Sequence, residues 1–307
     1  MVCARWLAAG LLLGGWAMTG CSIKKVAVNQ VGNALAGSGS AFSSDDDPEL
    51  VRAALPFSLK LMESLLAESP EHAGLLLAAS SGFTQYAYAF VQSDADVLEE
   101  TDFAAAEAER ARARRLYWRA QRYGLRGLEV AHPGLGAALR AHPREAVAAC
   151  TREDVPLLYW TAVAWGAAIA LSKDDPGTVA GAPRMEALID RALALDESWN
   201  EGAIHTFLIN YEYSRTDAPG DPAERARAHF RRAVELSELR LAAPFVTLAE
   251  VVSVQEQDVA EFDALLAQAL AINPDAVPEH RLENLIVQRR ARWLRAHKED
   301  LFVLPPR

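Results

Sequence analysis

A short sequence fragment recurs three times in the second half of the chain and limits the folds available to it. The copies read RALALDESW, RAVELSELR and QALAINPDA, and their aligned alanines, Ala192, Ala233 and Ala269, are separated by 41 and 36 residues. Each copy places a small residue and an aliphatic residue before a polar residue and a turn. Because small residues let two helices approach closely, the fragment indicates the end of the second helix in a repeated helical hairpin.

The rest of the chain agrees with a fold made of helices alone. From Asp47 to about residue 300 the apolar residues follow helical spacing, and no alternating strand pattern with hairpin turns occurs. Asp47 can cap a helix whose first turn holds Pro48. We therefore expect an all-α fold over 47–302, a tetratricopeptide-like (TPR-like) array of helical hairpins that resembles an α-solenoid, with 303–307 as a tail. The irregular spacing of the repeats leaves a non-repetitive helical bundle as the alternative.

One stretch raises the question of a membrane span. Val155 to Ser172 contains no charged residue over 18 positions, about the length at which an apolar run becomes a candidate span. Alanines dilute its hydrophobicity and charged residues follow from Lys173, so we predict a central helix that is buried on all sides. Trp160 and Trp165 point about 140° apart on such a helix. We expect one to pack between helices and the other, Trp165, to face a cavity.

The N-terminus predicts export. Residues 1–20 have the layout of a secretory signal peptide, with one arginine in MVCARW, the apolar run LAAGLLLGGWA and then MTGC. This ending resembles a bacterial lipobox, which implies cleavage before Cys21 and lipidation of its thiol; an ordinary signal peptide cut elsewhere is the alternative. Ser22 favours the outer membrane, by resemblance to the sorting of Gram-negative lipoproteins. Residues 21–46 are rich in Gly, Ser and Asn and predict a flexible tether.

Composition and motifs exclude several classes of function. With 41 acidic and 31 basic residues the net charge is −10, which argues against nucleic-acid binding and against electrostatic docking on anionic lipid. No metalloprotease motif, Cys/His zinc cluster, phosphate loop or nucleophile elbow is present, so we expect no enzyme activity, no cofactor and no metal. Cys150 is expected to be a small buried hydrophobic residue.

Aromatic residues are the candidates for a binding site. They gather in three of the predicted helices and can either fill the core or line an apolar cavity with a few polar tips. We therefore take the following side chains as candidate cavity residues: Phe83, Tyr86, Tyr159, Trp160, Trp165, Trp199, His205 and Tyr211.

Five blocks of sequence together resemble the TatT lipoproteins, the T component associated with some tripartite (TRAP) periplasmic transporters. They read SLLAESPEHAGLLLAASSGFTQYAYAFVQ, RARRLYWRAQRYGLRGLE, DVPLLYWTAVAWGAAIALSKDDP, RALALDESWNEGAIHTFLINYE and RLENLIVQRRARWL, and they extend from about Asp45 to Phe302. The resemblance implies a TPR-like lipoprotein with an apolar pore or cavity, which assembles as a trimer. It also implies a periplasmic partner, the substrate-binding P component of a TRAP system, and small apolar or amphipathic ligands.

These patterns lead to one expected function and one alternative. We expect an envelope lipoprotein, attached to the membrane only through its lipid and facing the periplasm. It would bind a small ligand, or hand one over, together with a solute-binding protein. The alternative is a scaffold that organises envelope proteins through its helices and binds no small ligand.

Overall fold

The computed structural model describes residues 20–37 and 39–303, and over these residues the chain is helical and contains no strand. The predicted signal peptide, apart from Gly20, and the last four residues of the predicted tail lie outside the described residues. The all-α prediction is therefore confirmed for the part of the chain that the structure describes. Asp47 caps the first long helix as expected, since its side chain accepts hydrogen bonds from the backbone N–H groups of Glu49 and Leu50.

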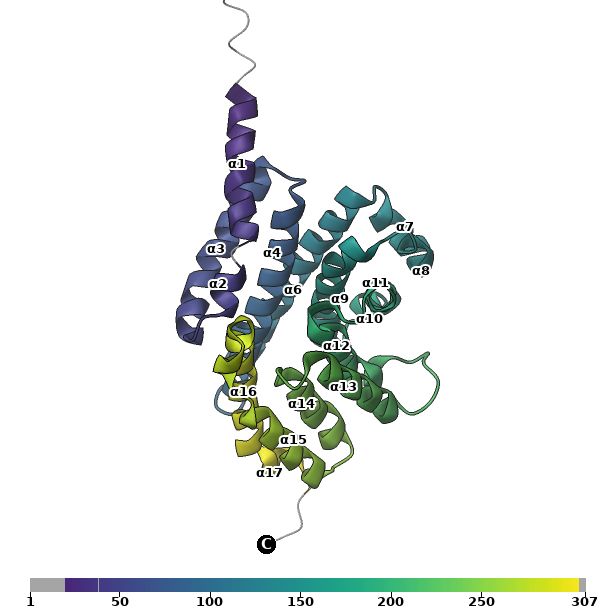
Figure 1. Cartoon of the computed structure of the whole chain (residues 1–307). Helices are drawn as coiled ribbons and strands as arrows, with labels where there is room; N and C mark the ends of the chain where they lie inside the picture. The colour runs from purple at the N-terminus through teal and green to yellow at the C-terminus, as the bar shows by residue number, and fades with distance from the viewer. Residues whose placement is uncertain (1–19, 38, 304–307) are drawn as a thin grey trace, which may run out of the picture.

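The N-terminal part of the array is built around one long helix. Its elements are α3 (Pro48–Glu68), α4 (Ala73–Tyr86), the π-helical turn η1 (Ala87–Gln92), α5 (Ser93–Leu98) and α6 (Phe103–Ala131). Helix α6 packs between α4 and the following long helix, α9 (Val155–Ala170) (Figure 1). Gly124 of α6 makes this close packing possible, because an added Cβ there would lie 2.1 Å from Thr161 Oγ1 and 2.9 Å from Ser80 Oγ.

Helix α9 is the uncharged stretch of the sequence, and it is a core helix. Leu158, Thr161 and Ala162 are fully buried, and Gly166 admits the ring of Phe207 to van der Waals contact. Within the described residues, no helix combines the length and the apolar character that crossing a membrane requires. The prediction of a buried central helix is confirmed.

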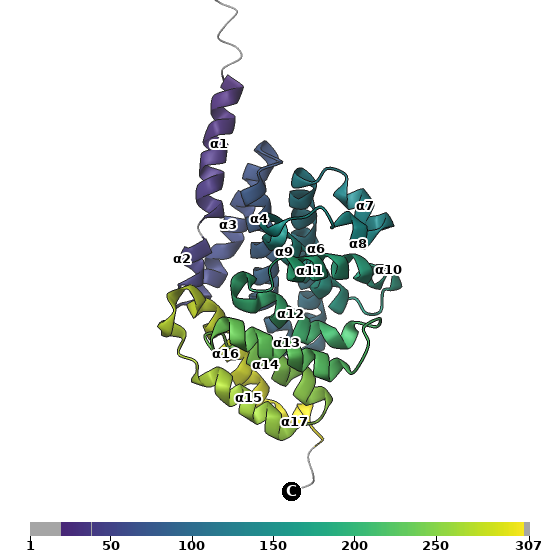
Figure 2. The ribbon, with the colours of Figure 1, turned by 45° about the vertical axis from the view of Figure 1, so that its right-hand side comes forward.

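Short elements surround α9 and lead to the repeated hairpins. They are α7 (Leu135–Ala141), α8 (Pro143–Ala146), the 3-10 turn η2 (Arg152–Asp154), α10 (Pro176–Val179), α11 (Ala182–Leu195), the 3-10 turn η3 (Trp199–Gly202), α12 (Ala203–Tyr211) and the 3-10 turn η4 (Glu212–Ser214). Figure 2 shows α10 and α11 on the same side of the molecule as α7 and α8. This arrangement covers one flank of α9.

The C-terminal part contains the remaining hairpins. Its elements are α13 (Pro222–Ser237), α14 (Ala243–Leu248), the π-helical turn η5 (Ala249–Ser253), α15 (Val259–Ala271), the 3-10 turns η6 (Pro274–Ala276) and η7 (Pro278–His280), α16 (Arg281–Ala296) and α17 (Lys298–Leu301). The three repeated alanines lie near the C-terminal ends of α11, α13 and α15, and each is 0% exposed. The repeated fragment therefore marks equivalent close-packed positions, as predicted.

The last long helix returns to the first ones, so that the array closes on itself. Arg281 of α16 donates a hydrogen bond to the carbonyl oxygen of Ser44 at 2.9 Å, and Arg289 pairs with Glu49 at 2.8 Å. Arg290 binds Asp96 of α5 at 3.0 Å and Glu250 of η5 at 2.5 Å. Helix α16 thus connects the C-terminal hairpins to the N-terminal helices (Figure 1).

The segment predicted to be a tether has two helices, α1 (Gly20–Ala36) and α2 (Gly39–Ser43). The C-terminal half of α1 docks on the start of α4: His72 Nε2 lies 3.3 Å from the carbonyl oxygen of Asn29, and Ser69 donates a hydrogen bond to the Asn29 side chain at 2.8 Å. Gly32 is buried against His72 and allows this approach. The sequence pattern predicted no regular structure here, and the flexibility of 21–46 stays a prediction.

Candidate functional site

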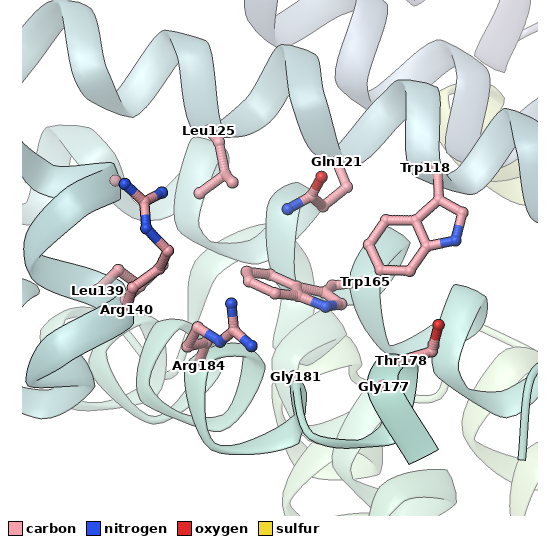
Figure 3. Close-up of a pocket in the computed structure, with 11 residues that line it drawn as sticks. Trp118, Gln121, Leu125, Leu139, Arg140, Trp165, Gly177, Thr178, Gly181 and Arg184 are labelled. Atoms are coloured by element: carbon pink, nitrogen blue, oxygen red, sulfur yellow. The ribbon is translucent and has the colours of Figure 1, made fainter. Parts of the chain in front are cut away.

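A pocket of about 330 Å³ lies where α6, α7, α9, α10 and the start of α11 meet (Figure 3). We call it the indole pocket after its two tryptophans. Its lining residues are Trp118, Gln121, Leu125, Gly136, Leu139, Arg140, Trp165, Gly177, Thr178, Gly181 and Arg184. Trp118, Gln121 and Leu125 are spaced three and four residues apart, so α6 presents them on one face.

The two indoles form the apolar part of this pocket. Trp165 is 5% exposed, and its ring meets that of Trp118 edge-on with centroids 6.4 Å apart. Gly181 passes directly beside the Trp165 ring, because an added Cβ at this position would lie 2.7 Å from Trp165 Nε1. A side chain at position 181 would therefore displace the indole and deform the pocket.

One buried polar group of the same pocket is unpaired within the part of the chain that the structure describes. The Trp165 Nε1–H is buried and makes no hydrogen bond with any described residue. A buried donor without an acceptor costs about 1–3 kcal/mol, so a bound acceptor would recover free energy at this position. Gln121, also buried, presents its amide beside Trp165 (Figure 3).

Two arginines supply positive charge at the pocket. The Arg184 guanidinium lies 5.3 Å from the centroid of Trp165, in cation–π contact, and Arg140 lies across the pocket on α7 (Figure 3). Among the described residues, neither arginine has a carboxylate within ion-pair distance. Glu129, the acidic residue whose charge acts with that of Arg140, is itself held by the backbone N–H groups of Gly134 and Gly136. A guanidinium without a carboxylate partner is well suited to an anion.

Trp165 lies at a pocket, as the sequence analysis expected, whereas Trp160 lies elsewhere. Trp160 packs edge-on against Tyr159 at 5.0 Å, and Tyr159 contacts Trp199 at 4.7 Å. Tyr211 stacks on Phe207 and donates a hydrogen bond to Glu186 at 2.7 Å. That Trp165 contacts a ligand stays a prediction.

Phe83 and Tyr86 belong to a different part of the core. Phe83 stacks on Tyr123 at 6.0 Å, and Tyr86 packs against Phe90 at 5.8 Å, both beside arginines. Of the eight candidate aromatic and histidine residues, only Trp165 lines the indole pocket. Four further lining residues were not predicted from the sequence: Trp118, Gln121, Arg140 and Arg184. The helical spacing of Trp118, Gln121 and Leu125 was the one local signal.

Three titratable groups, two tyrosines and one glutamate, are desolvated by the surrounding protein. Tyr88 is 51% exposed, yet desolvation by the surrounding protein raises its pKa to about 12. Glu283 of α16 is also exposed, and desolvation raises its pKa as well. Burial, and then the charge of Glu283, raise the pKa of Tyr159. The charge of Glu283 contributes to the pKa shifts of both tyrosines, so these three groups lie near one another.

His205 belongs to a pair of histidines. Its Nδ1 lies 2.8 Å from Nδ1 of His229, and its Nε2 lies 3.2 Å from Glu197. A hydrogen bond between two ring nitrogens needs one donor and one acceptor, so both rings cannot carry a proton there at once. Burial, and then the positive charge of His229, lower the pKa of His205 below its ordinary value of 6.5.

This pair predicts a loss of stability in mild acid. Because the pKa of His205 is lowered by folding, the unfolded chain binds more protons below pH 6.5, and the free energy of unfolding falls as the pH falls through that value. The pKa of Glu197 is also lowered, so its contribution is lost only below about 4.5. We expect the urea-denaturation midpoint of His205→Gln to change less between pH 7 and 5 than that of the wild type. His142→Gln, at an exposed histidine, is the control, and an equally steep His205→Gln profile would contradict this account.

The fold and the pocket together define a class of protein: an all-α TPR-like array, closed on itself, with a pocket of small-molecule size. A family model described as TRAP transporter T-component matches residues 44–302. The chain belongs to this family, and its role is associated with TRAP transport. It is similar to an uncharacterized protein of Treponema pallidum (strain Nichols), with 35% identity over 307 residues, covering 92% of this chain and 94% of the relative.

Proposed function

We propose that the protein is an accessory of a TRAP system that binds a small amphipathic anion in the indole pocket and works with a periplasmic solute-binding protein. The ligand class is supported by two arginines and one indole N–H that lack carboxylate or hydrogen-bond partners among the described residues and lie beside two indoles. The family membership supports the transport role.

The chemistry of the pocket favours a ligand with a planar apolar body and one carboxylate. A volume of about 330 Å³ is at the small end of known ligand sites, which suits a molecule of one or two rings. The indoles of Trp118 and Trp165 stabilise such a body by stacking and by excluding water. Arg140 and Arg184 can then bind the carboxylate as a guanidinium fork.

Binding of a matched pair of probes tests this ligand class. We expect calorimetry to detect indole-3-acetate binding and to find indole-3-acetamide at least about tenfold weaker, because a hydrogen bond to a charged group contributes ~1.5–3 kcal/mol. Arg184→Met should lower the affinity for indole-3-acetate by a similar factor and leave the affinity for indole-3-acetamide unchanged. Arg144→Met, at an exposed arginine of α8 outside the pocket, is the control. Equal affinities for the acid and the amide, or no binding of either, would contradict the proposed ligand class.

The proposed partner and anchor have their own tests. Co-purification from envelope extracts should recover a TRAP solute-binding protein with the wild-type chain, and its repeated absence counts against the partnership. Labelled palmitate should be incorporated by the wild-type chain and not by Cys21→Ser. Labelling that persists in Cys21→Ser would contradict lipidation at this residue.

One observation favours a protein–protein contact made by α3. Leu50 and Phe57 lie two turns apart on α3 and are 58% and 74% exposed. Apolar side chains on one exposed helix face are typical of a surface that another protein covers. We propose that this face contacts a second copy of the chain, consistent with the trimer implied by the TatT resemblance. Light scattering that finds a monomer for wild type and Phe57→Ser alike would reject this contact.

A further inference from the structure

Three side chains with metal-binding chemistry meet away from the indole pocket. They are His132 at the end of α6, Cys150 in the loop after α8, and Asp154 in η2. One ring nitrogen of His132, Cys150 Sγ and a carboxylate oxygen of Asp154 all lie within 4.8 Å of one another, and Nε2 of His132 is 2.9 Å from Asp154 Oδ2. Imidazole, thiolate and carboxylate are the side-chain ligands that zinc uses.

The backbone holds each of these residues in place. The Asp154 carboxylate accepts a hydrogen bond from the backbone N–H of Thr151 at 2.8 Å, and the backbone N–H of His132 bonds to Leu128 at the end of α6. Arg191 donates hydrogen bonds to the carbonyl oxygens of Ala148, at 3.0 Å, and Cys150, at 2.5 Å. Hydrogen bonds of this kind, made around metal ligands, orient the ligands before a metal ion binds.

These three side chains are accessible from one side, where His132 and Asp154 reach the surface. Cys150 is 1% exposed, whereas the side chain of His132 is 24% exposed and that of Asp154 is 11% exposed. A water molecule entering past His132 can supply a fourth ligand. Zinc bond lengths of ~2.0–2.3 Å place tetrahedral ligand atoms roughly 3.3–3.6 Å apart, so small rotations of these side chains suffice.

We propose that His132, Cys150 and Asp154 form a binding site for a zinc-class divalent metal ion. The Cys150 thiol loses its proton to solvent when the ion binds, so that one thiolate and one carboxylate balance the two positive charges. His132 binds through the Nε2 lone pair, and its ring proton moves to Nδ1. The ion replaces the hydrogen bond between Nε2 and Asp154.

Ligand chemistry selects the class of ion. Sulfur and nitrogen ligands favour zinc, cobalt and copper over magnesium and calcium, which require oxygen ligands. Burial, and then the charge of Asp154, raise the pKa of the Cys150 thiol to about 11, so the thiol stays protonated until a metal ion stabilises the thiolate. The spacing of the three residues in the chain matches no common zinc motif, which is why the sequence analysis expected no metal.

Cobalt(II) gives a direct test with the full-length chain. We expect one equivalent of cobalt to produce a thiolate-to-cobalt charge-transfer band in the near ultraviolet and the visible bands of a tetrahedral ion, and zinc to displace it. Cys150→Ser should abolish the charge-transfer band, and Asp154→Asn should weaken binding about tenfold or more. Because Cys3 and Cys21 are also in this chain, the Cys150 variant identifies the thiol.

A matched control separates this site from other histidine–carboxylate pairs. His297 pairs with Glu100 at 2.7 Å, so His297→Gln removes such a pair at another place and should leave the spectrum unchanged. Excess zinc should also raise the melting temperature of wild type and not that of Cys150→Ser. A band that persists in Cys150→Ser, or equal zinc affinity in the two proteins, would overturn the proposal without affecting the indole pocket.

Discussion

Replacing Gly124 with alanine is expected to lower the free energy of unfolding by about 3 kcal/mol, the upper range for overpacking a well-packed core. The new Cβ would lie 2.1 Å from Thr161 Oγ1 on α9 and 2.9 Å from Ser80 Oγ on α4. Alanine favours a helix by about 1 kcal/mol over glycine, which is too little to offset the displacement of two neighbouring helices.

Urea denaturation followed by circular dichroism measures this effect. Adding Thr161→Ala removes the nearest atom, so the double variant should recover part of the lost stability even though Thr161 Cβ is only 3.0 Å from the added atom. Gly39→Ala is the control, since no heavy atom lies within 4 Å of its added Cβ. A Gly124→Ala protein as stable as wild type would show that α4, α6 and α9 can separate at little cost.

Replacing Arg290 with methionine is expected to destabilise the protein by about 2 kcal/mol, below the ~3–5 kcal/mol typical of a fully buried pair. The Arg290 side chain is 20% exposed and lies between Asp96 and Glu250, and its guanidinium also covers the ring of Trp293 at 4.3 Å. Without it, Glu250 would lose its ion-pair partner among the described residues, and Asp96 would keep only its longer pair with Arg110, at 3.9 Å.

The pH dependence of this variant has a definite sign. Burial raises the pKa of Asp96 even though Arg290 opposes the shift, so this carboxyl favours the folded state more as the pH falls. In Arg290→Met the Asp96 carboxyl loses that opposing charge. The loss of stability relative to wild type, measured by urea denaturation, should therefore shrink as the pH falls from 7 to 4. Arg289→Met is the control, because its pair with Glu49 is exposed and contributes ~0–1 kcal/mol. Equal losses in the two variants would contradict the special role of Arg290.

The fold was predictable because its signals are local. Helical spacing, the Asp47 cap and the repeated alanines each act within a few residues, and the structure has them where the sequence places them. The 100° step of a helix also separates Trp160 from Trp165 without tertiary information. The helix over residues 20–36 was missed because its docked half depends on His72 and Ser69 in the region that begins α4.

The pocket could not be predicted in the same way. Its walls come from α6, α7, α9, α10 and α11, and packing between distant segments decides which of these helices meet. Arg140 and Arg184 are distinctive because neither has a carboxylate partner within residues 20–37 and 39–303, and only a folded structure reveals a missing partner. The cluster of His132, Cys150 and Asp154 was hidden for the same reason.

The return of α16 to the N-terminal helices changes how this array can fold and vary. An open array gains stability one unit at a time, and units can be added or lost at its ends. Here Arg281 binds Ser44 and Arg289 binds Glu49 across nearly the whole chain, so these bonds require the closure of a very long loop. Contacts this distant form late in folding and only once the C-terminus has been synthesised. We therefore expect the insertion or deletion of one hairpin to break the contacts of α16 with Ser44 and Glu49.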